Sequence, residues 1–321
     1  MTEVAVSMRE YVTGHSGLRY LFFGGKGGVG KTALAGASAC WLAGQGRRTL
    51  LVSTNPVHSL SSLLDQDVFG RQTPVASAPG LTAWEIDTRE TIERSKREIT
   101  EKINWFLKFA DIGARAEEFV ESATMNPAFE ESAMFESMID VMFADEYDVY
   151  VFDTAPTANA RRLLGMSKVY SLWVEKMLAS RQEARSLREL LSFSKRHEED
   201  PLLDYLTGFR ERMGRARELL TSPELTAFFF VTLPEALPIA VIERFINWFD
   251  EFGIPVGGVV VNGVLQPAHE GAPDFVLNRL RMQADYLDEI QRKFGDQVRA
   301  LVPQFEREIR GVPMLQRAAE A

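Results

Sequence analysis

A glycine-rich run with two lysines and a threonine is the part of the sequence whose residue types most directly suggest chemistry. Residues 25–32 read Gly-Lys-Gly-Gly-Val-Gly-Lys-Thr, which matches the spacing of a phosphate-binding loop. Glycines let the backbone curl so that successive N–H groups point at phosphate oxygens. Lys31 can neutralise the β- and γ-phosphates of ATP, and the Thr32 hydroxyl can bind Mg²⁺. The residues expected to hold ATP or ADP here are Gly25, Lys26, Gly27, Gly28, Val29, Gly30, Lys31, Thr32 and Ala33.

The segments on either side of this loop are suited to position it. The apolar residues 20–23 before the loop predict a buried parallel strand, and residues 32–43 after it predict a helix. A helix that begins near Lys31 adds the positive end of its dipole to the phosphate site. A second buried strand at residues 49–53 completes a β-α-β unit. This context disfavours the alternative of a glycine-rich turn without a ligand.

The rest of the chain alternates between strand and helix patterns. The segments expected as buried strands are residues 81–86, 148–152, 227–232, 256–261 and 298–303, and those expected as helices are residues 237–252, 275–294 and 313–319. This alternation predicts an α/β fold with a doubly wound, mainly parallel sheet. We expect one P-loop ATPase domain over residues 1–321. Longer helical stretches predict a helical subdomain above the nucleotide site, from roughly residues 88–135 and 165–222.

The composition excludes some classes of function. Of the 321 residues, 45% are hydrophobic and 25% are charged, which is typical of a globular protein with a sizeable core. The net charge of −9 disfavours nucleic acid as a partner, because such binding needs a basic face. A single cysteine, Cys40, excludes an intrachain disulfide and favours a reducing compartment. Residues 1–19 lack an apolar signal segment and no run is long enough to span a membrane, so we expect a cytoplasmic protein.

The second lysine of the loop, Lys26, is not required by the ordinary phosphate-loop pattern. It could be solvated, or it could serve a second nucleotide across a dimer interface. Residues 24–32 resemble the deviant Walker A loop of the Min-system, partition and nitrogenase-iron-protein class. In that class the extra lysine contacts the nucleotide of the partner subunit. The resemblance therefore implies a homodimer with nucleotide at its interface.

Two more segments resemble the family of the arsenite-pump ATPase and the tail-anchored-protein-targeting ATPase. Residues 53–60, Ser-Thr-Asn-Pro-Val-His-Ser-Leu, resemble the first switch loop of that family, and residues 153–157, Asp-Thr-Ala-Pro-Thr, resemble its second. Asp153 at a strand end could hold Mg²⁺ through water or sense the γ-phosphate; the alternative is a helix N-cap. The resemblance covers about Tyr20 to Arg317 and implies a single-domain, prokaryotic-type ATPase that converts ATP to ADP and phosphate.

Later segments resemble the base-recognition elements of the same family. These are residues 231–235, 260–262 and 302–311. By that resemblance Asn262 reads the adenine edge, to which an Asn side chain can offer both a donor and an acceptor. Glu235 would lie near the partner's nucleotide, and residues 303–306, which include Pro303 and Phe305, would border the adenine. The alternatives are a turn after a strand for Asn262 and a surface position for Glu235.

The chain departs from the family in both switch loops. Asn55 stands where the family normally has an aspartate that polarises the attacking water. An amide can orient water but cannot accept its proton as a carboxylate can. We therefore expect tight ATP binding with slow hydrolysis, whether Asn55 is natural or engineered. Residues 158–162 also replace the usual Gly-His-Thr-Leu-Arg, which stiffens the hinge. The residues expected to act in catalysis are Asn55, Lys26, Lys31 and Asp153, with Thr32 and Asp153 as the metal ligands.

An apolar stripe in the expected helical subdomain suggests a client. The targeting branch holds membrane-protein helices in a groove of apolar helices, and adaptable Met-containing surfaces suit such clients. The alternative is that the stripe is core. The stripe consists of Val169, Trp173, Val174, Met177 and Leu178, to which Phe106, Phe109, Phe119 and Met125 are added.

Three functions remain open at this point. The first is a dimeric ATPase that couples its nucleotide state to opening and closing of the helical subdomains around a hydrophobic helical client or a membrane partner. The second is the catalytic subunit of an arsenite or anion pump, although the pump uses several cysteines and this chain has only Cys40. The third is a nucleotide-regulated binding module with little turnover. The Cys-x-x-Cys zinc pair of eukaryotic targeting ATPases is absent.

Overall fold

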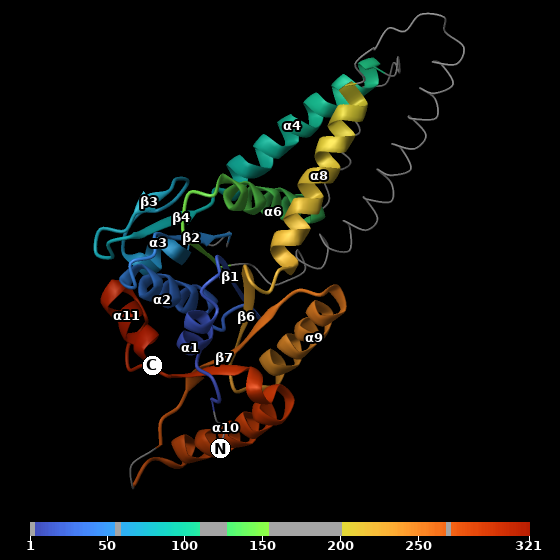
Figure 1. Ribbon diagram of the computed structural model, residues 1–321. Helices are drawn as coiled ribbons and strands as arrows, with labels where there is room; N and C mark the ends of the chain where they lie inside the picture. The colour runs from blue at the N-terminus through green and yellow to red at the C-terminus, as the bar shows by residue number, and fades with distance from the viewer. Residues whose placement is uncertain (1–3, 55–58, 110–126, 154–200, 268–270) are drawn as a thin grey trace, which may run out of the picture. The chain divides into compact units, whose positions relative to one another are not determined.

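The chain divides into two compact units (Figure 1). The computed structural model describes residues 4–54, 59–109, 127–153, 201–267 and 271–321. The first unit comprises Met1–Thr91, Glu136–Thr157 and Thr221–Ala321, and the second comprises Ile92–Phe135 and Ala158–Leu220.

The first unit is built on an eight-stranded sheet with the order β3-β4-β2-β5-β1-β6-β7-β8. All neighbouring pairs are parallel except β3 and β4. The predicted α/β fold with a mainly parallel sheet is confirmed. The strands are β1 (Tyr20–Gly24), β2 (Thr49–Ser53), β3 (Thr73–Pro74), β4 (Leu81–Glu85), β5 (Val149–Asp153), β6 (Thr226–Thr232), β7 (Val256–Val264) and β8 (Val298–Pro303).

The central strands are apolar throughout because both of their faces are covered. In β1, Leu21 and Phe23 belong to a core cluster that includes residues of α2 (Lys31–Gly44). Phe22 points to the opposite face, where its ring stacks on Phe152 of β5 and Phe228 of β6 at centroid distances of 4.7 and 4.3 Å. Because successive side chains of a strand point to opposite faces, β1 contributes apolar side chains to the core on each face of the sheet.

Helices cover the two faces of this sheet (Figure 1). On one face α2 packs with α3 (Ser59–Leu64) and α11 (Gly311–Glu320). Gly36 permits this close approach, since a Cβ there would lie 3.0 Å from Leu63 of α3 and 3.2 Å from Leu315 of α11. The other face is covered by α9 (Ala236–Phe252), against which α10 (Asp274–Phe294) packs.

The described part of the second unit is helical. It contains most of α4 (Thr88–Phe109), the first half of α6 (Pro127–Ala144) and nearly all of α8 (Pro201–Thr221). Within the described ranges, no helix combines the length and the apolar character that crossing a membrane requires. The predicted apolar stripe at residues 169–178, together with Phe119 and Met125, lies outside the described residues, as do the side chains of Phe106 and Phe109.

Three short elements were not predicted from the sequence. They are α1 (Met8–Gly14), α3 and β3, apart from the single-turn 3-10 helix η1 (Gly295–Gln297), and each is too short to show a clear periodicity. A signal for α1 was present in the sequence, because Ser7 and Glu10 have the spacing of a capping box. In the structure the Ser7 side chain accepts from the Glu10 backbone N–H, and the Glu10 side chain accepts from that of Ser7.

Candidate functional site

The glycine-rich loop lies at the switch point of the sheet. It follows β1, which lies between β5 and β6, and in the sheet the strands β2 to β5 lie on one side of β1 and the strands β6 to β8 on the other. In open α/β sheets, ligands bind at the carboxyl ends of the strands where the strand order reverses. The loop ends at Gly30, which immediately precedes α2. Backbone N–H groups at the start of that helix are therefore available to an anion, as the sequence predicts.

Two glycines of the loop have conformations and surroundings that exclude a side chain. Gly25 has φ 142° and Gly30 has φ 91°, a region that side chains disfavour. A Cβ at Gly25 would collide with the carbonyl of Val231, and one at Gly30 would collide with the amide of Asn262. The loop backbone therefore lies directly against the ends of β6 and β7, while Gly27 and Gly28 are exposed.

Lys31, the first residue of α2, is half-buried and bonds back across the loop. Its Nζ donates to the carbonyl oxygen of Lys26 at 3.1 Å. Burial lowers the pKa of Lys31, and the charge of Asp153 opposes that effect. Lys26 is also half-buried, and in the described part of the chain no carboxylate pairs with it. Both lysines that were predicted to contact phosphate are thus partly exposed residues of the loop, where a phosphate could reach their charges.

Asp153 is the centre of a buried polar cluster beside the loop. Its side chain is 1% exposed, and its Oδ2 accepts from Thr32 Oγ1 at 2.7 Å and from Ser53 Oγ at 3.1 Å. Burial raises the pKa of Asp153, an effect opposed by the hydrogen bond from Thr32 and the charge of Lys31. The structure thus brings together Thr32 and Asp153, the two predicted metal ligands, although they are 121 residues apart.

The segment at residues 53–60, which resembles the first switch loop of the family, begins at this cluster. Thr54 follows Ser53 and donates its backbone N–H to the Asp153 carbonyl at 3.1 Å. Ser53 was not singled out from the sequence, although it opens the segment that resembles the first switch loop. Asn55, the residue expected to position water, lies outside the described residues.

The geometry fits a phosphate with a hard cation beside it. A hydroxyl and a carboxylate meet at Thr32 and Asp153, and oxygen ligands of this kind suit Mg²⁺. Within the described ranges, no group of three or more His, Cys, Asp and Glu side chains could hold a metal. An ion at this point would therefore depend on phosphate oxygens and water for its remaining ligands, as Mg²⁺ commonly does. We call residues 25–32 with Ser53 and Asp153 the phosphate side.

Asn262 joins the phosphate side to the neighbouring strands. It lies in β7, and its Nδ2 donates to the carbonyl oxygen of Val29 at 2.9 Å. This hydrogen bond uses one of the two N–H donors of the Asn262 amide and does not involve its oxygen, which is an acceptor. The contact with the loop was not predicted. Reading of adenine by Asn262 stays a prediction.

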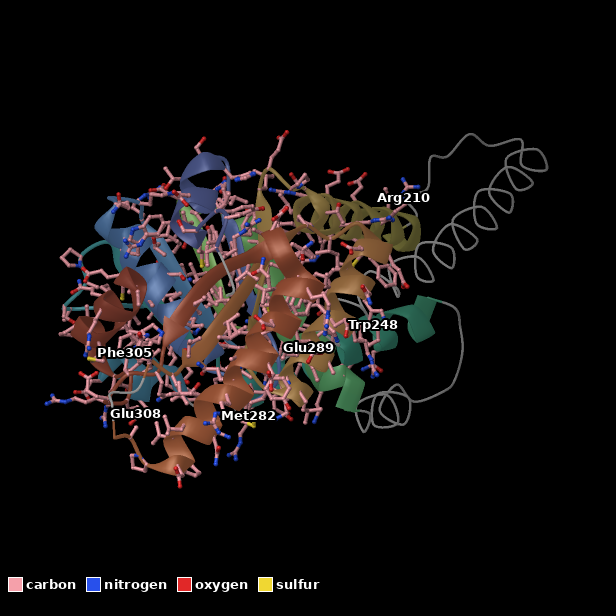
Figure 2. All side chains as sticks on the ribbon, turned by 90° about the horizontal axis from the view of Figure 1, so that it is seen from below. Arg210, Trp248, Met282, Glu289, Phe305 and Glu308 are labelled. Atoms are coloured by element: carbon pink, nitrogen blue, oxygen red, sulfur yellow. The ribbon has the colours of Figure 1, made fainter. Side chains whose placement is uncertain are left out.

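The residues expected to border adenine lie at the end of β8 and directly after it, and β8 is the neighbour of the strand that carries Asn262. Pro303 lies opposite Val264 of β7, and the backbone N–H of Gln304 donates to the Val264 carbonyl at 2.8 Å. Phe305 is half-buried under the Arg317 guanidinium, which lies 5.0 Å from its ring centroid. Figure 2 shows Phe305 and Glu308 on this segment. We call Asn262, Pro303 and Phe305 the base side.

Glu235 and Ala33 complete the set of predicted residues. Glu235 precedes α9 as its N-cap residue and lies 3.9 Å from Arg279 of α10, with both side chains about half exposed. Ala33 is in the first turn of α2 and is half-buried, and Val29 of the loop is buried. Glu235 therefore lies just after β6, with its side chain about half exposed, and its role toward a partner's nucleotide stays a prediction.

Comparison with known proteins shows which family and which proteins the chain resembles. Residues 18–321 match the family described as "Anion-transporting ATPase". An arsenical pump-driving ATPase of Halobacterium salinarum is 33% identical over 98% of this chain and 45% of its own length. A second protein with that name, from Aquifex aeolicus, is 31% identical over 93% of this chain and 97% of its own. The protein named "ATPase get3" of Pyrenophora tritici-repentis is 30% identical over 94% of this chain and 90% of its own.

The lengths of these relatives differ. The chain spans less than half of the Halobacterium protein, but nearly all of the Aquifex protein and most of the Pyrenophora protein. The similarity to the last two therefore extends over the whole fold, including the second unit.

Proposed function

Because this chain belongs to the family of anion-transporting ATPases and is an ATPase, we propose that it works as a homodimer that couples Mg-ATP binding to movement of its helical unit. In this proposal the helical unit handles a hydrophobic, membrane-protein helix. The relatives named as pump-driving ATPases and as "ATPase get3" support the ATPase chemistry equally, so the coupling and the client are argued from this chain's own residues.

The position of Asp153 carries the coupling proposal. It is in direct contact with Thr32 of the phosphate loop, and its carbonyl accepts from Thr54 at the start of the first switch loop. The second unit resumes at Ala158, so only residues 154–157 separate Asp153 from it along the chain. Binding or release of Mg-ATP at Thr32 should therefore alter the contacts of Asp153, which is close in the chain to the second unit.

The proposal gives each site residue a role, which the geometry at Thr32, Lys31 and Asp153 supports. Lys31, held across the loop, stabilises negative charge on the γ-phosphate, and Lys26 adds charge from the partner subunit. Thr32 and Asp153 hold Mg²⁺, directly or through water, and this ion supplies further neutralisation of phosphate charge when bound. Asn55 orients the attacking water. Asn262, Pro303 and Phe305 bind the adenine.

Slow hydrolysis is the distinctive property that we propose for this chain. Asn55→Asp restores a proton acceptor near the attacking water, so phosphate release is expected to rise about 100-fold or more, with ATP affinity little changed. The matched control is Asn247→Asp, which adds the same charge at an exposed position of α9. An unchanged rate in the Asn55→Asp protein would refute this part of the proposal and would favour a binding module that turns over little.

The homodimer is tested by its dependence on nucleotide. Lys26 has no carboxylate partner among the described residues, which leaves its charge available to a phosphate. Light scattering of the wild-type chain should show a dimer with Mg²⁺ and a slowly hydrolysed ATP analogue. Lys26→Ala should lose that dimer but retain ATP binding as a monomer. A Lys26→Ala protein that dimerises like the wild type would contradict the shared site.

The client proposal is favoured over arsenite transport by the state of Cys40. Burial raises the pKa of this thiol to about 11, whereas soft metal and metalloid ligands are thiolates. A protein ending in a 20-residue apolar helix should co-purify with the chain in the presence of Mg-ATP. The same protein with three arginines in that helix should not. Arsenite-stimulated hydrolysis without capture of the helix would instead support the pump.

A further inference from the structure

Glu85, the last residue of β4, is a buried carboxylate that contacts the helix after the first switch loop. It is 0% exposed. The backbone N–H of Leu60 donates to its Oε1 at 2.9 Å, and Ser61 donates to its Oε2 from Oγ at 2.7 Å and from the backbone N–H at 3.4 Å. N–H groups in the first turn of a helix have no acceptor within the helix, and a buried carboxylate needs donors. Glu85 thus holds the start of α3.

The first switch loop is tied at both of its ends. Residues 55–58 join Thr54 to Ser59, the first residue of α3. On the entry side, Thr54 donates its backbone N–H to the Asp153 carbonyl at 3.1 Å. On the exit side, the first turn of α3 is bonded to Glu85. The backbone carbonyl of Asp153 and the carboxylate of Glu85, at the ends of two strands, therefore bind the residues on either side of residues 55–58.

The sheet register explains why these two residues act together. Ser53 of β2 pairs with Asp153 of β5 on one side and with Glu85 of β4 on the other. Side chains of paired residues project to the same face of a sheet, and this face is the one covered by α2 and α3. Asp153 reaches Thr32 of α2 there, and Glu85 reaches α3. The contact of Asp153 with Thr32 and the contact of Glu85 with α3 thus come from the two strands that neighbour β2.

The rest of α3 is held by other contacts. Leu63 packs where Gly36 of α2 leaves room, and Asp65 at the helix end pairs with Arg310 at 2.7 Å. Because Leu63 and Leu64 at the end of α3 are buried in the core, loss of the Glu85 bonds should release its first turn rather than the whole helix. The first turn is the part that is continuous with the switch loop.

We propose that Glu85 is a positioning residue for ATP hydrolysis, which acts by fixing the point at which the first switch loop enters α3. This inference rests on the ATP site proposed above. Glu85 touches no substrate, so its loss should slow phosphate release while ATP affinity is kept. A small displacement of a water-orienting group can cost about 100-fold in rate.

The test compares Glu85→Gln, Ser61→Ala and the double variant in single-turnover phosphate release and in equilibrium Mg-ATP binding. Glu85→Gln is expected to slow release about 10- to 100-fold, and Ser61→Ala to slow it less, since two of the three bonds remain. If Glu85 acts through α3, the double variant is no slower than Glu85→Gln alone. Glu251→Gln, which removes an exposed carboxylate from α9, is the matched control.

A second readout separates positioning from a purely structural cap. Amide hydrogen exchange of the peptide that contains Leu60 and Ser61 should be faster in Glu85→Gln than in wild type. Faster exchange with unchanged phosphate release overturns the proposal, and so does an equal loss of ATP affinity and rate. If Glu85→Gln does not fold, Ser61→Ala decides by the same two measurements. Wild-type Mg-ATP binding is measured first, because its absence would refute the ATP site itself and not the role of Glu85.

Discussion

The phosphate side and the base side of the site are built in different ways. On the phosphate side, Asp153 is 1% exposed and its partners Thr32 and Ser53 come from neighbouring elements of the sheet and α2. On the base side, Phe305 is held by Arg317, which pairs with Glu306, and the latter two side chains are 50% and 61% exposed. Interactions between charges are strong in a buried environment and weak in water. The phosphate side should therefore tolerate little change, and the base side much more.

The strongest contrast is expected for two aspartates at opposite ends of β5. Asp153→Asn keeps the shape of the side chain but removes its charge and reverses one of its bonds with Thr32 or Ser53. We expect ATP hydrolysis to fall by about 100- to 1,000-fold. Asp148→Asn, just before β5, removes a carboxylate that pairs with Arg48 at the surface, and its effect on hydrolysis should be small. Equal rates of ATP hydrolysis in the two variants would contradict a special role for Asp153.

The rate at which a thiol reacts should differ between Cys40, which is buried in the helix after the phosphate loop, and a cysteine placed on the base side. Burial raises the pKa of Cys40 from 9.0 to about 11, which makes its thiolate about 100-fold rarer at pH 8 than that of an ordinary thiol. A cysteine placed by Gln304→Cys, at an exposed position beside Phe305, should react at least about 100-fold faster with Ellman's reagent than Cys40 does. Cys40 should react fully only after unfolding in guanidinium.

Asn262 lies where the two sides meet, and its loss should have an intermediate effect. Asn262→Ala removes the hydrogen bond to the Val29 carbonyl together with the proposed contact to adenine. Each such bond contributes about 1 kcal/mol, so the loss of both is expected to lower Mg-ATP affinity about 30-fold. Asn247→Ala on the exposed face of α9 is the control. A loss for ATP but not for GTP would assign the residue to base recognition, whereas equal losses would assign it to the loop alone.

The smallest effect is expected for the base-side ion pair. The hydrogen bond from Arg317 lowers the pKa of Glu306 from 4.5 to about 2. A carboxylate with a lowered pKa stabilises the fold above pH 4.5, and this contribution is lost as the pH falls toward 2. Glu306→Gln should therefore lower the melting temperature by less than about 2 °C at pH 7. The difference from wild type should shrink below pH 4.5 and in high salt, and a difference that grows on acidification would contradict this interpretation.

The sequence by itself determined the parts of the site that are continuous in the chain. The strand at residues 20–24, the loop and the start of α2 at Lys31 follow one another, so local propensity and glycine spacing were sufficient to predict them. The buried strands at the ends of which Asp153 and Asn262 lie were also visible, because strands covered on both faces are continuously apolar. Asp153 could be nominated together with Thr32, but the bond of Asp153 to Ser53 and that of Asn262 to Val29 could not.

Tertiary structure alone decided which residues meet. The order β4-β2-β5 places Glu85, Ser53 and Asp153 in one row across three strands, and no local pattern encodes that order, since it depends on where each crossover connection packs. The bond between Asn262 and Val29 joins positions 233 residues apart. Glu85 was overlooked because an acidic residue that ends a strand looks like ordinary surface. Only the packing of α3 on that strand end buries its carboxylate and gives it three donors.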